Sequence, residues 1–105
     1  MENEDQEQQP TRTRLPKEKE VLGVLDQRLG GSRLRARCFD GKTRICRIPG
    51  RLKRSLWLRE GDVILIAPWD YDNDKGDVLY KYRKGEVNIL KQKGLLKEIE
   101  EKEEF

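Results

Sequence analysis

Apolar and polar residues alternate along the middle of the chain in short runs that are separated by turn signals. The clearest run lies at 32–39, where Leu34, Ala36 and Cys38 hold one parity and three arginines hold the other. Such alternation is typical of a strand with one buried and one exposed face. This pattern, together with short buried apolar runs, predicts five strands at residues 20–29, 32–39, 42–48, 62–69 and 77–83.

Gly23 interrupts the first of these segments, inside a dense apolar stretch. It predicts a bulge or a sharp bend, as in a strand that serves two sides of a barrel.

Two further segments favour helix. Residues 51–58 place Leu52 and Leu56 at i and i+4, and the period becomes helical again from residue 86, with a break or kink at Gly94. Residues 70–76, which are acidic and polar, predict a solvated loop.

The turn at Asp40-Gly41 fixes the register between the second and third strands. A two-residue loop would place Cys46 and Ile48 on the side of the arginines, which is unfavourable for apolar residues. An odd-length loop returns them to the apolar side, and we therefore predict it, with both cysteines as buried free thiols. The exposed side, here called the arginine face, then consists of Arg33, Arg35, Arg37 and Arg47.

Five strands with a short helical element between the third and fourth predict an all-β fold. The pattern matches the five-stranded OB-fold barrel, here followed by a C-terminal helix. An SH3-like barrel is the alternative, although it would not normally place a basic helical segment at that point. The expected organisation is a disordered acidic tail at 1–11, a basic extended arm at 12–19, the barrel at 20–85, and a helix with an acidic tail at 86–105.

Charge is segregated along this organisation, although the net charge is only +3. Residues 1–11 carry −4, and residues 12–59 carry fifteen Lys and Arg against four acids, a net +11. Residues 60–94 carry −1 and residues 95–105 carry −3. A concentrated basic block is the electrostatic footprint expected of a protein that binds a polyanion. A solvated charged surface is the alternative.

Composition excludes several classes of function. The chain of 105 residues has no histidine, which removes any catalytic scheme built on imidazole. Two cysteines without histidine cannot complete a four-ligand zinc site. No apolar run approaches the ~18 residues of a membrane span, and no signal-peptide pattern is present. We expect a monomeric cytoplasmic binding module with no cofactor, metal or catalytic residue and no membrane partner.

Two groups of residues suit RNA. The arginine face repels itself unless a polyanion neutralises it. The segment from Pro49 to Trp57 combines a turn, three basic residues and an indole that can stack on an unpaired nucleobase. Trp57 could equally pack beneath the barrel, and Trp69, which follows a buried strand, is expected to be structural. The candidate RNA-binding residues are Arg33, Arg35, Arg37, Arg47, Arg51, Lys53, Arg54 and Trp57.

Two weaker motifs carry no site. Gly41-Lys42-Thr43 resembles the end of a phosphate-binding loop, but the required earlier glycine is replaced by Ala36 and the setting is a hairpin. The acids at 70, 72, 74 and 77 lack the glycine and the bidentate glutamate of a calcium loop.

Longer runs carry a family resemblance over residues 12–94. They are Leu-Gly-Gly-Ser-Arg (29–33), Arg-Cys-Phe-Asp-Gly-Lys-Thr-Arg (37–44), Cys-Arg-Ile-Pro-Gly-Arg-Leu-Lys-Arg (46–54) and Trp57, with shorter matches at 60–62, 68–69, 77–78 and 81–82. They resemble translation initiation factor 1A of archaea and eukaryotes, whose S1-like domain is an OB-fold. Proline before Gly50 and the short tails are closer to the archaeal members.

The resemblance implies a factor that binds the decoding (A) site of the small ribosomal subunit. It would promote initiation-complex assembly, initiator tRNA placement and start-site selection without catalysis. In the family the basic segment and its tryptophan contact rRNA, which carries over to Arg51, Lys53, Arg54 and Trp57. Homologues of initiation factor 2 and initiation factor 5B are candidate partners, and initiator tRNA is reached indirectly. A general single-strand RNA-binding or RNA-chaperone protein is the alternative.

Two departures from eukaryotic members concern the ends of the chain. Those members have a basic N-terminal tail, whereas residues 1–11 are acidic here. The candidate arm contacts that remain are Arg12, Arg14, Lys17 and Lys19. The long acidic C-terminal tail that contacts initiation factor 5B in eukaryotes is also short here, which puts that contact in doubt.

Overall fold

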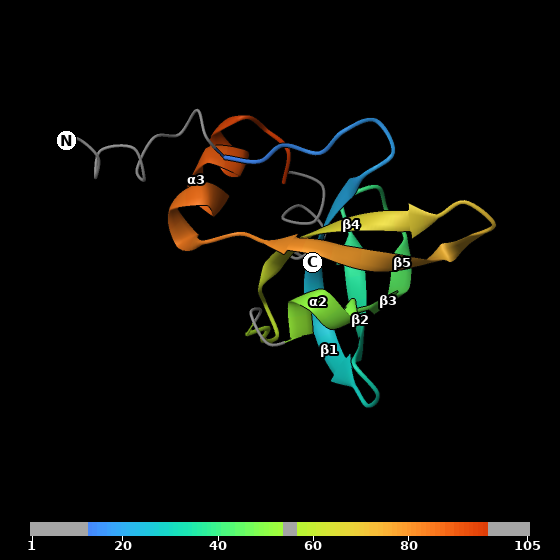
Figure 1. Ribbon diagram of the computed structural model, residues 1–105. Helices are drawn as coiled ribbons and strands as arrows, with labels where there is room; N and C mark the ends of the chain where they lie inside the picture. Colours follow the sequence, from blue (N-terminus) through green and yellow to red (C-terminus); the bar gives the residue numbers. More distant parts are fainter. Residues whose placement is uncertain (1–12, 54–56, 97–105) are drawn as a thin grey trace.

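The computed structural model describes residues 13–53 and 57–96. Within them the elements are β1 (Val21–Leu29), β2 (Arg33–Cys38), β3 (Thr43–Arg47), α2 (Gly50–Lys53), β4 (Val63–Trp69), β5 (Asp72–Lys81) and α3 (Lys84–Gln92). The strands close into a barrel in the order β1-β2-β3-β5-β4, and α3 lies beside one end of it (Figure 1). This confirms the predicted OB-fold barrel with a short helix between the third and fourth strands and a helix after the fifth.

β1 serves two sides of the barrel, as its sequence predicted. Gly23 is opposite Cys38 of β2 and also opposite Ile64 of β4. A Cβ on Gly23 would lie 3.0 Å from Ile66 Cδ1 and 3.2 Å from the Arg37 carbonyl oxygen, so glycine permits this close approach. The register shift lies between Leu25 and Gln27 instead of at Gly23. The position predicted for the bulge was therefore wrong, because the glycine relieves crowding between strands and does not itself interrupt the ladder.

The hairpin of β2 and β3 has the predicted register. Leu34 is opposite Cys46, and Arg33 is opposite Arg47. Both cysteines are free and buried, as expected, and they are not opposite one another. Burial raises the pKa of the Cys46 thiol to about 12, so this thiol stays protonated and inert near neutral pH.

The core consists of two clusters that share β4. Ile64 and Ile66 point into the barrel with Leu34 and Val78, whereas Leu65 belongs to a second cluster between the barrel and α3. β4 is therefore covered on both faces, which explains its uninterrupted apolar run. The second cluster includes Leu90 of α3 and Leu96 after it, and Gly94, at φ +78°, ends the helical segment.

The fifth strand begins earlier than predicted. Residues 70–76 were expected to form a loop, but β5 starts at Asp72 and Trp69 is opposite Asp72. The prediction was wrong because the first residues of β5 are polar and carry no apolar alternation. Their side chains are held by ion pairs instead, such as Lys42 Nζ to Asp74 Oδ1 at 2.9 Å.

α2 is shorter than predicted. The helix was expected over residues 51–58, but it spans Gly50–Lys53, and residues 57–59 are not helical. Leu52 packs against the barrel core, as its place in the expected apolar pair required. Its expected partner Leu56 lies outside the described residues. No helix among the described residues is long and apolar enough to cross a membrane.

We predict that Gly76→Ala destabilises the barrel. A Cβ there would lie 2.7 Å from Ile66 Cγ2 and 3.0 Å from the Ala67 carbonyl oxygen, so β4 and β5 would have to separate. Overpacking of this kind costs about 1–3 kcal/mol. Thermal unfolding checks the loss, with Gly85→Ala as the control, because nothing lies within 4 Å of a Cβ at Gly85. A Gly76→Ala protein as stable as the control would contradict the tight strand contact.

Candidate nucleic-acid interface

The arginine face forms on the outer side of β2 and β3, as predicted. Arg33, Arg37 and Arg47 are exposed and Arg35 is half-buried. The register places Arg33 directly opposite Arg47, and Arg37 opposite Thr43. Like charges directly opposite one another are destabilising by up to about 1 kcal/mol. This sheet surface therefore concentrates positive charge at a cost to stability.

Two carboxylates offset part of this charge. Asp26 Oδ2 accepts from Arg35 Nε at 3.0 Å, and Asp77 Oδ1 accepts from Arg47 Nε at 3.1 Å. Among the described residues, none forms an ion pair with Arg33. Exposed ion pairs of this type are worth little, so a phosphate can displace or share them. The face remains basic, with at least one guanidinium available to an anion.

A surface hollow joins the arginine face to α2. It has a volume of about 340 Å³ and lies between the turn after β1 and the turn after β3. Arg47 and Lys53 line it, together with Ser32, Pro49 and Gly50. Two cations beside a concave surface with backbone groups form a suitable environment for a phosphate.

The residues predicted on the basic segment lie partly within the described chain. Arg51 and Lys53 are exposed on the single turn of α2, and Arg54 lies outside the described residues. The helix is anchored by Leu52, which packs on the barrel core. Arg51 and Lys53 are therefore exposed on a helix that is anchored to the barrel beside the hollow.

Trp57 is 76% exposed, although its backbone is held firmly. Lys81 Nζ donates to the Trp57 carbonyl oxygen at 2.7 Å, and an Arg28 guanidinium nitrogen donates to the Leu58 carbonyl oxygen at 3.1 Å. Leu58 itself is buried in the barrel core. The indole is thus displayed to solvent from an anchored segment and does not pack beneath the barrel. An exposed, positioned aromatic ring is suited to base stacking.

The predicted arm residues divide into three groups. Arg12 lies outside the described residues. Arg14 contacts the barrel: its guanidinium lies 5.8 Å from the centre of the Tyr80 ring, and its carbonyl oxygen accepts from the Tyr82 hydroxyl. Lys17 and Lys19 are exposed. Among the described residues of the arm, these two lysines therefore keep exposed side chains that are not held against the barrel in the way that Arg14 is.

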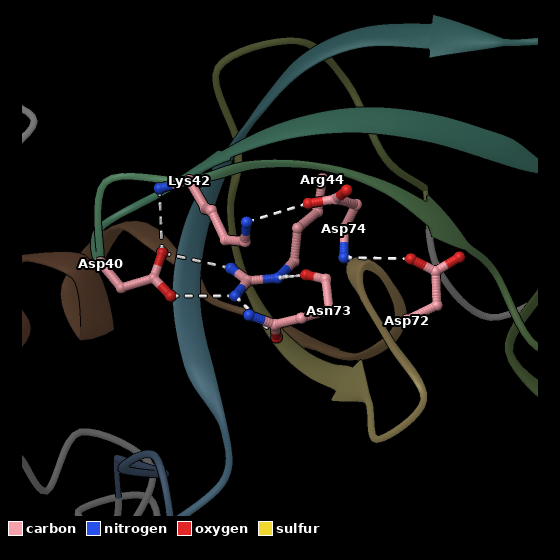
Figure 2. Close-up of polar contacts among 6 residues, drawn as sticks. All are labelled: Asp40, Lys42, Arg44, Asp72, Asn73 and Asp74. Atoms are coloured by element: carbon pink, nitrogen blue, oxygen red, sulfur yellow. Dashed lines mark hydrogen bonds and ion pairs between the residues drawn. The ribbon is translucent and has the colours of Figure 1, made fainter.

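Arg44 belongs to the basic block but not to the basic surface. Its side chain is 2% exposed and is surrounded by oxygen acceptors (Figure 2). Asp40 accepts from both terminal guanidinium nitrogens, at 3.1 and 3.0 Å, and the Asn73 carbonyl oxygen accepts from Nε at 2.7 Å. Burial disfavours its charge, but hydrogen bonds to Asp40 and Cys38 outweigh burial and raise the pKa of Arg44. A count of charges along the sequence therefore overstates the positive charge on the surface. The sequence signal for the burial of Arg44 was its shared parity with Cys46, which places both on the apolar side of the strand.

Sequence reasoning missed the contribution of β5 to the same surface. Lys75 is opposite Ile45 of β3, and Asp77 is opposite Arg47, because β5 runs parallel to β3. A parallel closure between strands distant in sequence has no local signal. The acids of this region pair with neighbouring bases, and no group of acids, cysteines or histidines suited to a metal ion is present among the described residues.

Together these features define a small OB-type barrel with an exposed basic surface suited to a polyanion. The family described as "Translation initiation factor 1A / IF-1" matches residues 10–104. Translation initiation factor 1A of Methanococcus aeolicus is 52% identical over 94 residues, covering 87% of this chain and 90% of that protein. That of Methanopyrus kandleri is 48% identical over 85 residues, covering 81% and 77%. The chain belongs to the translation initiation factor 1A family, which places it in translation initiation.

A solved structure supports the fold alone. YjeQ from Thermotoga maritima superimposes with a TM-score of 0.51 at 14% identity, over 61% of this chain and 23% of that one.

The translation initiation factor 1A family consists of non-enzymatic factors, and membership in it implies the small ribosomal subunit as partner.

Proposed function

We propose that this protein binds the decoding (A) site of the small ribosomal subunit through one continuous basic surface. Arg33, Arg35, Arg37 and Arg47 would follow the phosphate backbone of rRNA across the sheet. Arg51, Lys53 and Arg54 would extend this contact along the basic segment. The observation that supports the proposal best is the hollow that Arg47 and Lys53 both line, because it links the two predicted groups.

Trp57 would supply a contact of a different kind. Phosphate contacts position a protein on RNA, whereas unpaired bases are recognised by stacking and by hydrogen bonds to their edges. An exposed indole on an anchored backbone can stack on a base without rearrangement of the barrel. Lys17 and Lys19 would add contacts from the arm, as would Arg12. The acidic segments at 1–11 and 95–105 would repel RNA that does not contact the whole basic surface.

By occupying this site the factor would promote assembly of the initiation complex, placement of initiator tRNA and selection of the start site. These roles need no bond to be made or broken. Homologues of initiation factors 2 and 5B would then be neighbours on the same subunit.

We predict that the triple variant Arg51→Ala, Lys53→Ala, Arg54→Ala binds the small subunit more weakly and with less dependence on salt. Each lost phosphate contact removes roughly 0.7–0.9 from the slope of log affinity against log salt, so three contacts remove about two or more. The measurement is a titration of subunits at several salt concentrations. The control is Lys84→Ala, Lys91→Ala, Lys93→Ala, which removes the same charge from α3 and the residue after it. Equal slopes for both variants would contradict the assigned surface.

The alternative function is general binding of single-stranded RNA. The two functions differ in selectivity, so competition between small subunits and free oligonucleotides separates them. The proposal expects subunits to compete far better per binding site. Equal competition by an arbitrary single-stranded RNA would favour the alternative.

A further inference from the structure

Two aromatic residues that were not assigned to RNA above meet at the hairpin between β4 and β5. The rings of Trp69 and Tyr71 are stacked, with centroids 5.7 Å apart and an interplanar angle of 27°. Tyr71 is 85% exposed, the largest exposure among the large apolar and aromatic side chains described. This stacked pair, here called the hairpin platform, leaves most of the Tyr71 ring open to solvent.

The platform is held in place from the side of Trp69. The indole Nε1 donates to Asp77 Oδ1 at 3.2 Å, which fixes the ring relative to β5. The guanidinium of Arg47 lies 5.2 Å from the centre of the same ring and also pairs with Asp77. Trp69 is therefore constrained by a hydrogen bond and a cation–π contact before any ligand arrives. The half-buried Trp69 was expected to be structural, and these contacts show that its ring supports Tyr71.

Arg47 makes the platform continuous with the arginine face. Arg47 is opposite Arg33 of β2 on one side and opposite Asp77 of β5 on the other. Asp77 is in turn opposite Ala67, near the end of β4. A cation that contacts an aromatic ring and neighbours further cations is the arrangement used for single-stranded nucleic acid: bases stack on the ring while the cations follow the backbone.

We propose that the hairpin platform is a second base-stacking site, in which an unpaired nucleobase stacks on Tyr71 and the adjoining phosphate lies near Arg47. This inference rests on the proposed function, because it extends the same RNA surface beyond Arg47. It assigns a new RNA contact to Tyr71, which follows β4, whereas the Trp57 segment precedes that strand. A protein partner on the same aromatic pair is the competing explanation, and the experiments below separate the two.

The first experiment measures binding of the full chain to small ribosomal subunits. Tyr71→Ala should lower affinity by roughly 10-fold without lowering Tm, since base–aromatic stacking is typically worth this much and the ring is exposed. Tyr71→Phe keeps the ring and should bind as the unaltered chain does. Unchanged affinity for Tyr71→Ala would overturn the proposal. Because the unaltered chain is measured beside it, absence of subunit binding by that chain would instead overturn the proposed function.

The second experiment identifies the group that stacks. The chain has two tryptophans, so Trp57→Phe leaves Trp69 as the only indole. Titration of that protein with octaadenylate should quench Trp69 fluorescence, and an abasic strand of the same length should not. Octaadenylate should quench less in the Trp57→Phe, Tyr71→Ala protein. Equal effects of both strands, or none, would overturn base stacking, and a loss of subunit affinity in Tyr71→Ala without quenching would indicate a protein contact.

Discussion

Replacing Trp57 by alanine should lower affinity for the small ribosomal subunit by about 10-fold or more and leave Tm unchanged. Loss of a stacked base costs roughly 1–3 kcal/mol, and each 1.4 kcal/mol is a factor of ten. Stability should not change because the ring is 76% exposed and its neighbours hold the backbone through its carbonyl oxygen. Subunit binding and thermal unfolding of the same preparation provide the two measurements.

Leu58 gives the matched control for this prediction. It follows Trp57 directly but is 2% exposed, so Leu58→Ala should lose about 2–5 kcal/mol of stability. Trp57→Phe keeps an aromatic face and should retain most of the affinity. A Trp57→Ala protein that unfolds as Leu58→Ala does, or that binds subunits normally, would contradict the stacking role.

Replacing Asp40 by alanine should destabilise the barrel by about 2–3 kcal/mol. Asp40 accepts two hydrogen bonds from Arg44, which is 2% exposed, and its loss leaves a buried charge that keeps only neutral partners, Asn73 and Cys38, among the described residues. Breaking a buried pair from one side typically costs 3–5 kcal/mol, and the partial exposure of Asp40 places this pair below that range. Denaturant unfolding measures the loss. Asp74→Ala, which removes an exposed partner of Lys42, should change stability by less than about 1 kcal/mol.

The same ion pair predicts a pH dependence. Burial alone would raise the pKa of Asp40, but hydrogen bonds from Arg44 and from the Lys42 backbone N–H outweigh it and lower the pKa. A carboxyl group with a lowered folded-state pKa contributes stability above its unfolded pKa, and this contribution is lost as pH falls through the folded value. Stability should therefore decline below about pH 4. The decline should be shallower in Asp40→Asn, and an equally steep decline would exclude this carboxyl group as its source.

The sequence predicted those features that depend on local alternation. The parity of Leu34, Ala36 and Cys46 was sufficient to predict the β2–β3 register and the arginine face, because a one-residue slip would have exposed the apolar side. It did not predict the start of β5, because the residues from Asp72 to Lys75 are polar. They are held by Lys42 in the turn before β3, by Arg44 of β3 and by an ion pair within β5. The parallel pairing of β3 with β5 brought Asp77 to Arg47, and no local pattern encodes such a distant pairing.

The roles of individual side chains were also not predictable from the local sequence alone. Trp57 and Trp69 have similar local sequences, each beside apolar residues and a turn, and the sequence left the role of Trp57 open. The structure separates them through exposure and hydrogen bonding, which depend on Lys81 and Asp77 from β5. Arg44 was counted in the basic block of residues 12–59, although it is buried and its acceptors come from the preceding turn and from Asn73. Long-range partners thus decide which basic side chains are exposed.

We propose that this barrel occupies the decoding site of the small ribosomal subunit. The most direct measurement is nucleotide-resolution chemical footprinting of small-subunit rRNA with the factor bound. We expect protection concentrated at decoding-site nucleotides, weakened in the Arg51→Ala, Lys53→Ala, Arg54→Ala variant and retained in the α3 lysine control. Protection confined to another region of the rRNA, or protection that the two variants share equally, would contradict binding at the decoding site through the basic segment.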